Sequence, residues 1–347
     1  MKLLYLQEQL PIFQNRMYDT EAEAKACPKG DVRLVEDQQT GLVYNAAFCP
    51  EVMTYDDHYQ NEQAISPLFR QHLESVSQII SRCMGRGSLV EVGCGKGFFL
   101  EMLLAQDFDV TGFDPTYEGS NPRVVRHYFE PGVGIQAKGL ILRHVLEHIQ
   151  DPVTFLLKLK VANGGIGRVY IEVPCFEWIC RHRAWFDVFY EHVNYFRLSD
   201  FTRMFGTVIE SGHLFNGQYL FVVAELATLR TPKIDLKDCV IFPTDFTRNL
   251  MSRAEPGQTA IWGGASKGVI FSLLKERVGQ PISTVIDINP AKQGKYLPGT
   301  GLSVQPPSEA LVMLPKGSTI YVMNSNYLEE IKKMSNNAFN YIEVDHE

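Results

Sequence analysis

The chain has 347 residues, of which 45% are hydrophobic and 21% are charged, and its formal net charge is −7. A chain of this length exceeds one ordinary domain, so we expect two or three. The negative charge gives no electrostatic basis for binding nucleic acid or an anionic membrane. No apolar run approaches the roughly 18 residues of a membrane span.

The seven cysteines are scattered along the chain and form no C-x-x-C pair. This pattern argues against a zinc site or a disulfide framework, and it predicts a protein of the reducing cytoplasm with no bound metal. Glu8 interrupts the N-terminal segment where a signal peptide needs an apolar core, which favours the same compartment.

The N-terminal part of the sequence is mixed in pattern, and we treat residues 1–65 as a small module. It carries turn signals at residues 29–31 (Lys-Gly-Asp) and at Thr40-Gly41. A helix is predicted over residues 67–84, because a proline opens it and glycines at 85 and 87 interrupt the pattern after it.

Residues 88–104 carry the most informative motif of the chain. An apolar strand leads into a glycine-rich turn, and an apolar helix follows. Glycines alternate through the turn, at Gly93, Gly95 and Gly97, so that a ligand can lie against backbone without meeting a Cβ. Glu91 comes just before the turn, where a carboxylate suits a cationic ligand better than a pyrophosphate.

A second strand is predicted over residues 109–113, and it leads to Asp114, 23 residues beyond Glu91. A carboxylate at this spacing accepts the hydroxyls of a ribose in adenosine-binding folds. The order of strand, glycine loop, helix, strand and acid resembles the first motif of class I S-adenosylmethionine-dependent methyltransferases. The alternative is a tight turn that uses glycine without a ligand.

A third strand is predicted over residues 140–142, followed by a crossover helix within 150–162. His144 and His148 come directly after the strand, at the carboxyl edge where parallel strands present side chains to a ligand. We assign His144 to the cofactor site and His148 to the catalytic group. Local packing or helix capping by His148 is the alternative.

A fourth strand is predicted over residues 169–173, and an aromatic-rich segment follows it at residues 186–196. Tyr190, Glu191 and His192 lie side by side in that segment. A carboxylate that orients a histidine raises its basicity near neutral pH, so His192 is the candidate general base and Glu191 its partner. The alternative is an aromatic helix that packs on the sheet, with Glu191 in solvent.

The remaining sequence predicts a late buried strand at 220–224, a proline-marked linker around a helix at 229–258, and then a second α/β unit. That unit has strands at 260–262, 283–287 and 318–323, with a glycine turn at 263–268 and a helix from residue 269. It lacks the full G-x-G-x-x-G, so a structural role without a cofactor is the favoured reading.

Taken in order, these motifs resemble those of the sugar C-methyltransferases, which methylate nucleotide-linked keto-deoxysugars. The resemblance covers nearly the whole chain. It rests on the glycine loop, on His148, on the Tyr190-Glu191-His192 segment with Tyr195-Phe196, and on three C-terminal runs: 263–268, 287–300 and 324–326.

Two departures from that family pattern stand out. The family commonly has an N-terminal zinc module with C-x-x-C pairs, whereas Asp37 and Thr40 stand where two of the cysteines would fall. We therefore expect the module to persist without its metal. The family motif also often reads Tyr-x-Glu-His, and Phe189 occupies the tyrosine position here, with Tyr190 next to it.

The resemblance implies an α/β protein with three parts: the N-terminal module, a class I methyltransferase domain of Rossmann-like fold over 66–228, and a second Rossmann-like domain over 229–347 that binds the acceptor. S-adenosylmethionine would donate a methyl group to a carbon of a nucleotide-linked keto-deoxysugar through an enolate. His192 would be the base, with His148 or Tyr190 polarising the enolate. The alternatives are an O- or N-methyltransferase acting on another small molecule, and a non-catalytic binding protein.

Overall fold

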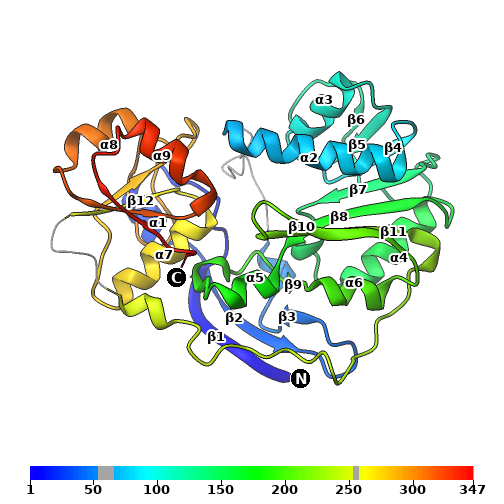
Figure 1. Cartoon of the computed structure of the whole chain (residues 1–347), viewed down its shortest axis with the longest axis horizontal. Coiled ribbons are helices and arrows are strands. Elements are labelled where there is room, and N and C mark those ends of the chain that lie inside the picture. Colours follow the sequence, from blue (N-terminus) through cyan, green and yellow to red (C-terminus); the bar gives the residue numbers. More distant parts are fainter. Residues whose placement is uncertain (54–65, 253–257, 347) are drawn as a thin grey trace.

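The computed structural model describes residues 1–53, 66–252 and 258–346. Three sheets organise this part of the chain. A seven-stranded sheet and a five-stranded sheet lie on opposite sides of the molecule, and the N-terminal strands run beneath both (Figure 1). No helix among the described residues is long and apolar enough to cross a membrane.

The seven-stranded sheet has the order β10-β11-β8-β7-β4-β5-β6. Its strands are β4 (Leu89–Val92), β5 (Val110–Phe113), β6 (Val124–Val125), β7 (Gly139–Arg143), β8 (Arg168–Pro174), β10 (Val208–Leu214) and β11 (Tyr219–Glu225). Strands β4 to β8 are parallel, while β10 and β11 form an antiparallel edge. The parallel order reverses between β4 and β7, and ligands of such sheets bind at the carboxyl ends of the strands at that reversal.

Helices cover both faces of this sheet. They are α2 (Pro67–Met84), α3 (Phe98–Ala105), α4 (Pro152–Ala162), α5 (Phe176–Arg181) and α6 (Leu198–Met204). Successive strand residues point to opposite faces. Leu89 therefore packs in the cluster that contains α2 and α3, while its neighbour Val90 packs in the cluster that contains α4 and α6. Burial on both faces explains why these strands read as continuous apolar runs.

The five-stranded sheet repeats the same winding. It is wholly parallel, with the order β14-β13-β12-β15-β16. The strands are β12 (Thr259–Trp262), β13 (Thr284–Ile286), β14 (Val304–Gln305), β15 (Thr319–Val322) and β16 (Asn340–Glu343), and the helices are α7 (Ser266–Arg277), α8 (Pro307–Met313) and α9 (Leu328–Met334). Its order reverses between β12 and β15, so the glycine turn after β12 lies at a second potential ligand crevice. The α/β fold with two Rossmann-like units is confirmed.

The third sheet joins distant parts of the chain. It is antiparallel and contains β1 (Lys2–Pro11), β2 (Lys29–Glu36), β3 (Val43–Asn45) and β9 (Asn194–Tyr195), with the short helix α1 (Glu21–Lys25) after β1. Strand β9 follows directly after His192. The N-terminal segment therefore holds the part of the chain that carries the predicted base.

Short 3-10 turns complete the described structure: η1 (Pro50–Val52), η2 (Leu146–His148), η3 (Trp185–Asp187), η4 (Leu226–Thr228), η5 (Arg248–Met251) and η6 (Ser325–Tyr327). The turn at Thr40-Gly41 is present, as the sequence predicts, between β2 and β3. Helices α2 and α4 also match their predicted positions. Each begins at a side-chain cap followed by proline, with Ser66 capping α2 and Asp151 capping α4.

Two sequence-based expectations are wrong. Residues 29–31 do not form a turn but begin β2, because pairing with β1 draws them into the antiparallel ladder. The described part of 229–258 contains the single 3-10 turn η5 and no α-helix. This segment runs over the N-terminal sheet instead, where Ile234 donates its amide to Gln39 and Val240 donates its amide to Glu36.

Candidate active site

The glycine loop after β4 leaves room for a ligand against its backbone. Gly93, Gly95 and Gly97 all have positive φ angles, of 73°, 54° and 81°. A Cβ added at Gly93 would lie 2.7 Å from Val145 Cγ2, whereas a Cβ at Gly95 would meet nothing within 4 Å. The space above Gly95 is therefore open, whereas Gly93 is required by packing within the protein, and a Cβ at Gly97 would lie only 3.1 Å from the Tyr117 ring.

Asp114, at the end of β5, braces this loop. Its Oδ2 atom accepts the amide of Gly95 at 2.8 Å, and its Oδ1 atom accepts the amide and hydroxyl of Thr116 at 2.8 Å and 2.7 Å. The predicted ribose-binding carboxylate thus lies at the loop, as the spacing indicates. In this structure its hydrogen bonds hold the loop in shape.

Glu91 lies beneath the loop and is only 3% exposed. Its Oε2 atom has no hydrogen-bond partner among the described residues. Burial raises the pKa of Glu91 to about 8, although the charge of Arg143 opposes the increase. A buried carboxylate with an unsatisfied oxygen under an open glycine loop fits a cationic ligand such as S-adenosylmethionine. When bound, that cofactor supplies an electrophilic methyl group on a sulfonium.

His144 follows β7 and links two buried carboxylates. Its Nδ1 atom lies 3.1 Å from Glu147 Oε1, and its Nε2 atom lies 3.2 Å from Glu172 Oε1. Burial lowers the pKa of His144, but the hydrogen bonds and charges of the two glutamates outweigh that effect and raise it to about 9. His144 is therefore an imidazolium at neutral pH, and it braces the crevice between β4 and β7.

A cavity of about 240 Å³ lies between the two Rossmann-like units. The seven-stranded unit contributes side chains from η2, η3 and the ends of β8 and β11, and the five-stranded unit contributes the turns after β12, β13 and β15. Its lining includes His144, Glu147, His148, Asp187, Phe189, His192, Lys267, Asp287, Asn289 and Lys292. The cavity thus joins the carboxyl edge of β7 and β8 to the turns of the five-stranded unit, and its lining does not include the glycine loop, Glu91 or Asp114.

His148 and His192 lie next to each other in this cavity. Their ring centroids are 5.0 Å apart, and the ring of Phe189 packs on His192 at 4.0 Å. Burial lowers the pKa of His192 well below its usual value, and the charges of His148, His144 and Lys267 lower it further. Burial also lowers the pKa of His148. Both rings are therefore neutral at pH 7, in contrast to the raised basicity that the sequence pattern suggests for His192.

His148 is anchored through one nitrogen. Its Nδ1 atom lies 2.9 Å from the backbone carbonyl of Glu191, and a carbonyl can only accept a hydrogen bond. The neutral ring therefore carries its proton on Nδ1, which leaves Nε2 as an acceptor. In this state His148 is unsuited to donating a hydrogen bond to an enolate.

Tyr190 and Glu191 turn toward the N-terminal sheet. The Tyr190 hydroxyl accepts the amide of Cys49 at 2.9 Å, and Glu191 Oε2 accepts the amide of Gln14 at 2.8 Å. Neither side chain lines the cavity, so the structure gives both a structural contact where the sequence suggests direct catalytic roles. His192, the next residue, lines the cavity.

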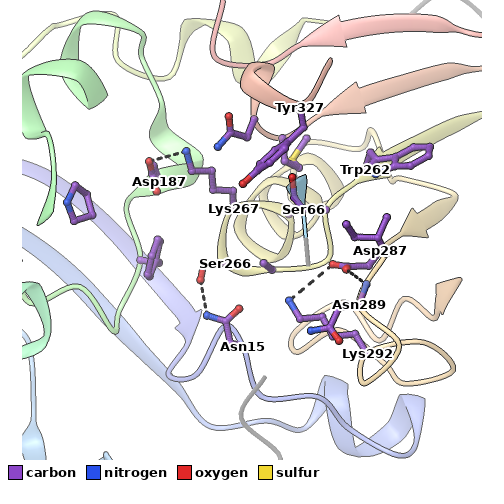
Figure 2. A pocket seen from close by; sticks show the side chains of 18 of the residues that line it. Asn15, Ser66, Asp187, Trp262, Ser266, Lys267, Asp287, Asn289, Lys292 and Tyr327 are labelled. Carbon is purple, nitrogen blue, oxygen red and sulfur yellow. Dashed lines mark hydrogen bonds and ion pairs between the residues drawn. The ribbon is translucent and has the colours of Figure 1, made fainter. Parts of the chain in front are cut away.

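The sequence does not single out three residues that the structure brings into the cavity: Glu147, Asp187 and Lys267. Lys267 Nζ lies 3.0 Å from Asp187 Oδ2, and this ion pair spans the two Rossmann-like units (Figure 2). The signal for Glu147 was present, because it lies between His144 and His148 in the sequence. Nothing local marks Asp187 and Lys267, which are 80 residues apart in sequence.

Two clusters of described residues bring three nitrogen, oxygen or sulfur atoms within 4.8 Å of one another. One consists of Glu147, His148 and His192 in the cavity. The other consists of Cys175, Glu177 and His213, outside the cavity, and this mixed set could hold a metal ion. At the position of the family's zinc module, Asp37 Oδ1 instead accepts the amide and hydroxyl of Thr40. The absence of bound metal stays a prediction.

Comparison with known proteins adds two family matches and several structural ones. A family model described as a methyltransferase domain matches residues 62–208, and one described as the C-methyltransferase C-terminal domain matches residues 242–341. The chain is an S-adenosylmethionine-dependent methyltransferase. Its two matched segments contain the glycine loop and the cavity-lining turns of the second unit.

None of the curated proteins matches this methyltransferase. Among solved structures, it resembles 1,6-didemethyltoxoflavin-N1-methyltransferase of Burkholderia thailandensis (15% identity, 58% of this chain and 98% of that chain, TM-score 0.35). It also resembles the N-methyltransferase NodS of Bradyrhizobium japonicum (14% identity, 47% and 98%, TM-score 0.35) and a methyltransferase of Aquifex aeolicus (16% identity, 46% and 94%, TM-score 0.36).

Proposed function

We propose that this methyltransferase transfers the methyl group of S-adenosylmethionine to a carbon next to a carbonyl, and that the acceptor is a nucleotide-linked keto-deoxysugar. The observation that carries the proposal is the shared cavity. One wall presents two neutral histidines from the carboxyl edge of the seven-stranded sheet, and the opposite wall presents the glycine turn of the second unit. The match to a C-methyltransferase C-terminal domain supports carbon as the methylated atom.

The wall formed by the second unit suits an anionic group such as a diphosphate. Helix α7 begins there without a side-chain cap, so the amides of its first turn face the cavity region with the positive end of the helix dipole. Lys267, which pairs with Asp187, and the buried Lys292, 3.8 Å from Asp287 Oδ2, lie in this wall, and Asn289 Nδ2 is a buried donor with no hydrogen-bond partner among the described residues (Figure 2). These groups are suited to bind a diphosphate, and this favours an acceptor that is linked to a nucleotide.

The neutral state of the histidines suits proton abstraction. Carbon becomes a nucleophile only after a proton next to the carbonyl leaves, and a neutral imidazole can accept it. His192, which lines the cavity beside Phe189, is the proposed base, and His148, whose Nε2 atom is also an acceptor, is the alternative that the experiment tests. Glu191 positions His192 indirectly, because its carboxylate accepts the amide of Gln14 and so holds this segment in place. The carbanion then displaces the methyl group from sulfur in line, and alignment of the two substrates supplies much of the rate.

The test combines methyl transfer with proton exchange. The protein is incubated with labelled S-adenosylmethionine and a panel of keto-deoxysugar nucleotides, and exchange of the acceptor's α-proton is followed separately in D₂O. We expect His192→Asn to lower turnover by roughly 10²-fold or more, with cofactor affinity almost unchanged. Exchange is lost in the same variant, even without the methyl donor.

His148→Asn is the companion variant. If His148 were the base, the exchange defect would move to that variant. Methyl transfer without α-proton exchange in any variant would instead indicate an oxygen or nitrogen acceptor. Binding of S-adenosylmethionine without transfer to any acceptor would favour the non-catalytic alternative.

A further inference from the structure

We propose that Glu147 is the positioning residue for the two histidines: its second carboxylate oxygen receives the N–H of the imidazolium that forms when His192 takes the acceptor's proton. This inference rests on the proposed function for its catalytic consequence. Its structural part, a carboxylate that sets the protonation of His148 and His192, stands without any acceptor.

Only one oxygen of the Glu147 carboxylate has a hydrogen-bond partner among the described residues. The residue is 1% exposed on η2, and its Oε1 atom lies 3.1 Å from His144 Nδ1. Its Oε2 atom is buried and has no hydrogen-bond partner among the described residues. A buried carboxylate oxygen without a donor is costly, so such an atom calls for a partner that arrives during function.

The two histidines lie close to the carboxylate of Glu147. A carboxylate oxygen of Glu147 and one ring nitrogen each of His148 and His192 all lie within 4.8 Å of one another. Both rings are neutral before the acceptor's proton is taken. The Nδ1–H of His148 donates a hydrogen bond to the backbone carbonyl of Glu191. Proton transfer to the His192 nitrogen that faces the acceptor would turn the ring into an imidazolium, whose other N–H would then carry positive charge near the Glu147 carboxylate.

Glu191 is the obvious competitor for this role because it is adjacent to His192 in sequence. Its Oε2 atom, however, accepts the amide of Gln14 at 2.8 Å, and its backbone carbonyl faces His148. Glu191 thus anchors the segment, while Glu147 lines the cavity together with the two histidines.

Several other charges act on this cluster. His144 lies between Glu147 and Glu172, Lys267 faces His192 from α7, and Asp187 pairs with Lys267. His144 and Lys267 oppose a positive charge on His192. Burial lowers the pKa of His148 and the charge of Glu147 opposes that decrease, and we extend this effect of Glu147 to the neighbouring His192 imidazolium.

The acceptor's C–H bond breaks, its proton moves to a nitrogen of His192, and the electron pair enters the enolate. A new C–C bond forms to the methyl group as the S–CH₃ bond breaks, which leaves S-adenosylhomocysteine. The proton then leaves His192 for solvent through the cavity. Glu147 stabilises the imidazolium during the interval and is neither consumed nor protonated.

The first experiment needs no acceptor. Imidazole titrations of the full chain with ¹³C-labelled histidine are recorded by NMR for wild type, Glu147→Gln and Glu191→Gln, with signals assigned from His148→Asn and His192→Asn. We expect Glu147→Gln to lower the pKa of His192 and of His148 by about one unit, because a nearby opposite charge is removed. Glu191→Gln should shift them much less. An unchanged His192 pKa in Glu147→Gln overturns the proposal.

The second experiment uses the acceptor that the labelling screen identifies. In Glu147→Gln we expect α-proton exchange to fall at least about tenfold and its acidic limb to move to lower pH, since the base is weaker. Glu147→Asp should recover part of the rate, and the Kd for S-adenosylmethionine should change little. A fall in rate with an unmoved pH limb indicates a merely structural role and overturns the proposal.

A metal ion is the remaining alternative occupant of this cluster. Elemental analysis and exchange assays with and without EDTA distinguish a bound metal ion from the proton-stabilising role of Glu147. Stoichiometric metal that depends on Glu147, with exchange abolished by EDTA, overturns the proton-stabilising role. If the NMR shifts occur but no acceptor undergoes exchange, the structural inference holds and the proposed function fails.

Discussion

At the scale of single residues, burial and charge decide which groups of the site are ionised. His144 contacts two glutamates and is cationic. His192 is neutral because burial and nearby positive charge both disfavour its protonation. Glu91 is a carboxylate kept neutral by burial until about pH 8. Two histidines of one site thus differ in protonation state, and a glutamic acid of that site is neutral at pH 7. Such perturbed ionisation is frequent in active sites.

We expect S-adenosylmethionine binding to release close to one proton at pH 7. Glu91 is protonated in the free protein, and a bound cation favours its ionised form. Calorimetry in buffers of different ionisation enthalpy measures the release. In Glu91→Gln the release should disappear and affinity should fall. Binding enthalpies that do not depend on the buffer would contradict this role of Glu91.

The same group affects stability. The folded protein retains the Glu91 proton up to about pH 8, while the unfolded chain loses it near 4.5. Between these values the folded state binds more protons, so this group makes the free energy of unfolding fall as pH rises, by about 1.4 kcal/mol per pH unit. Glu91→Gln should flatten that dependence in urea titrations from pH 5 to 8.

Gly95→Val should abolish cofactor binding. A branched Cβ would fill the open space above the loop, which no protein atom occupies within 4 Å. Gly85→Val is the matched control, since Gly85 also has a positive φ and open space but lies at the end of α2. Both variants should lose similar stability, and calorimetry should show lost binding only in the first. Equal binding in both would remove the loop from the cofactor site.

At the scale of elements, the β2–β3 connection shows how a hairpin closes without cysteines. Asp37 Oδ1 accepts the amides of Gln39 and Thr40 and the Thr40 hydroxyl, which forms a compact turn. Burial opposes ionisation here, yet the hydrogen bonds from Thr40 and Gln39 lower the pKa of Asp37. The turn therefore contributes stability that is lost as pH falls through that lowered pKa.

Asp37→Ala should lower the free energy of unfolding by about 1 kcal/mol, the usual net worth of such hydrogen bonds. Chelators should leave the melting temperature of the wild-type protein unchanged, because this turn is closed by side chain and backbone. Thermal unfolding with and without EDTA checks the second expectation. About one zinc per chain in elemental analysis would refute it.

At the scale of the whole molecule, the N-terminal sheet connects folding to catalysis. Strand β9 pairs with β3, Val193 accepts the amide of Asn45, and the Tyr190 ring packs against Gly30. The residues on both sides of His192 are thus held by the first fifty residues of the chain, beneath both Rossmann-like units (Figure 1). A distortion of that sheet should therefore displace His192 and leave the cofactor loop unchanged.

Gly30→Ala tests this connection. The added Cβ would collide with the Tyr190 ring, and relieving the clash shifts the segment that carries His192. We expect a loss of stability of about 1–3 kcal/mol and a fall in turnover of roughly tenfold, with the Kd for S-adenosylmethionine within about twofold of wild type. Gly87→Ala, where a Cβ meets nothing within 4 Å, is the control. Equal turnover in the two variants would contradict the connection.

The sequence by itself determined the local units of this protein. The glycine loop, Glu91 beneath it and Asp114 at the next strand end lie where their spacing predicts, because one strand–turn–helix–strand unit is governed by contacts between near neighbours. The same holds for α2 and α4, whose caps and prolines are local signals. The repeat of this unit after residue 258 was visible for the same reason.

Only the tertiary structure decided how the cavity is built. Adjacency of Tyr190, Glu191 and His192 in sequence does not reveal which side chain faces the cavity, and the answer depends on Gln14 and Cys49, more than 140 residues away. The free oxygen of Glu147 and the pairing of Asp187 with Lys267 likewise arise from elements that meet only on folding. Protonation states follow burial and charge in three dimensions, and these are properties of packing rather than of sequence order.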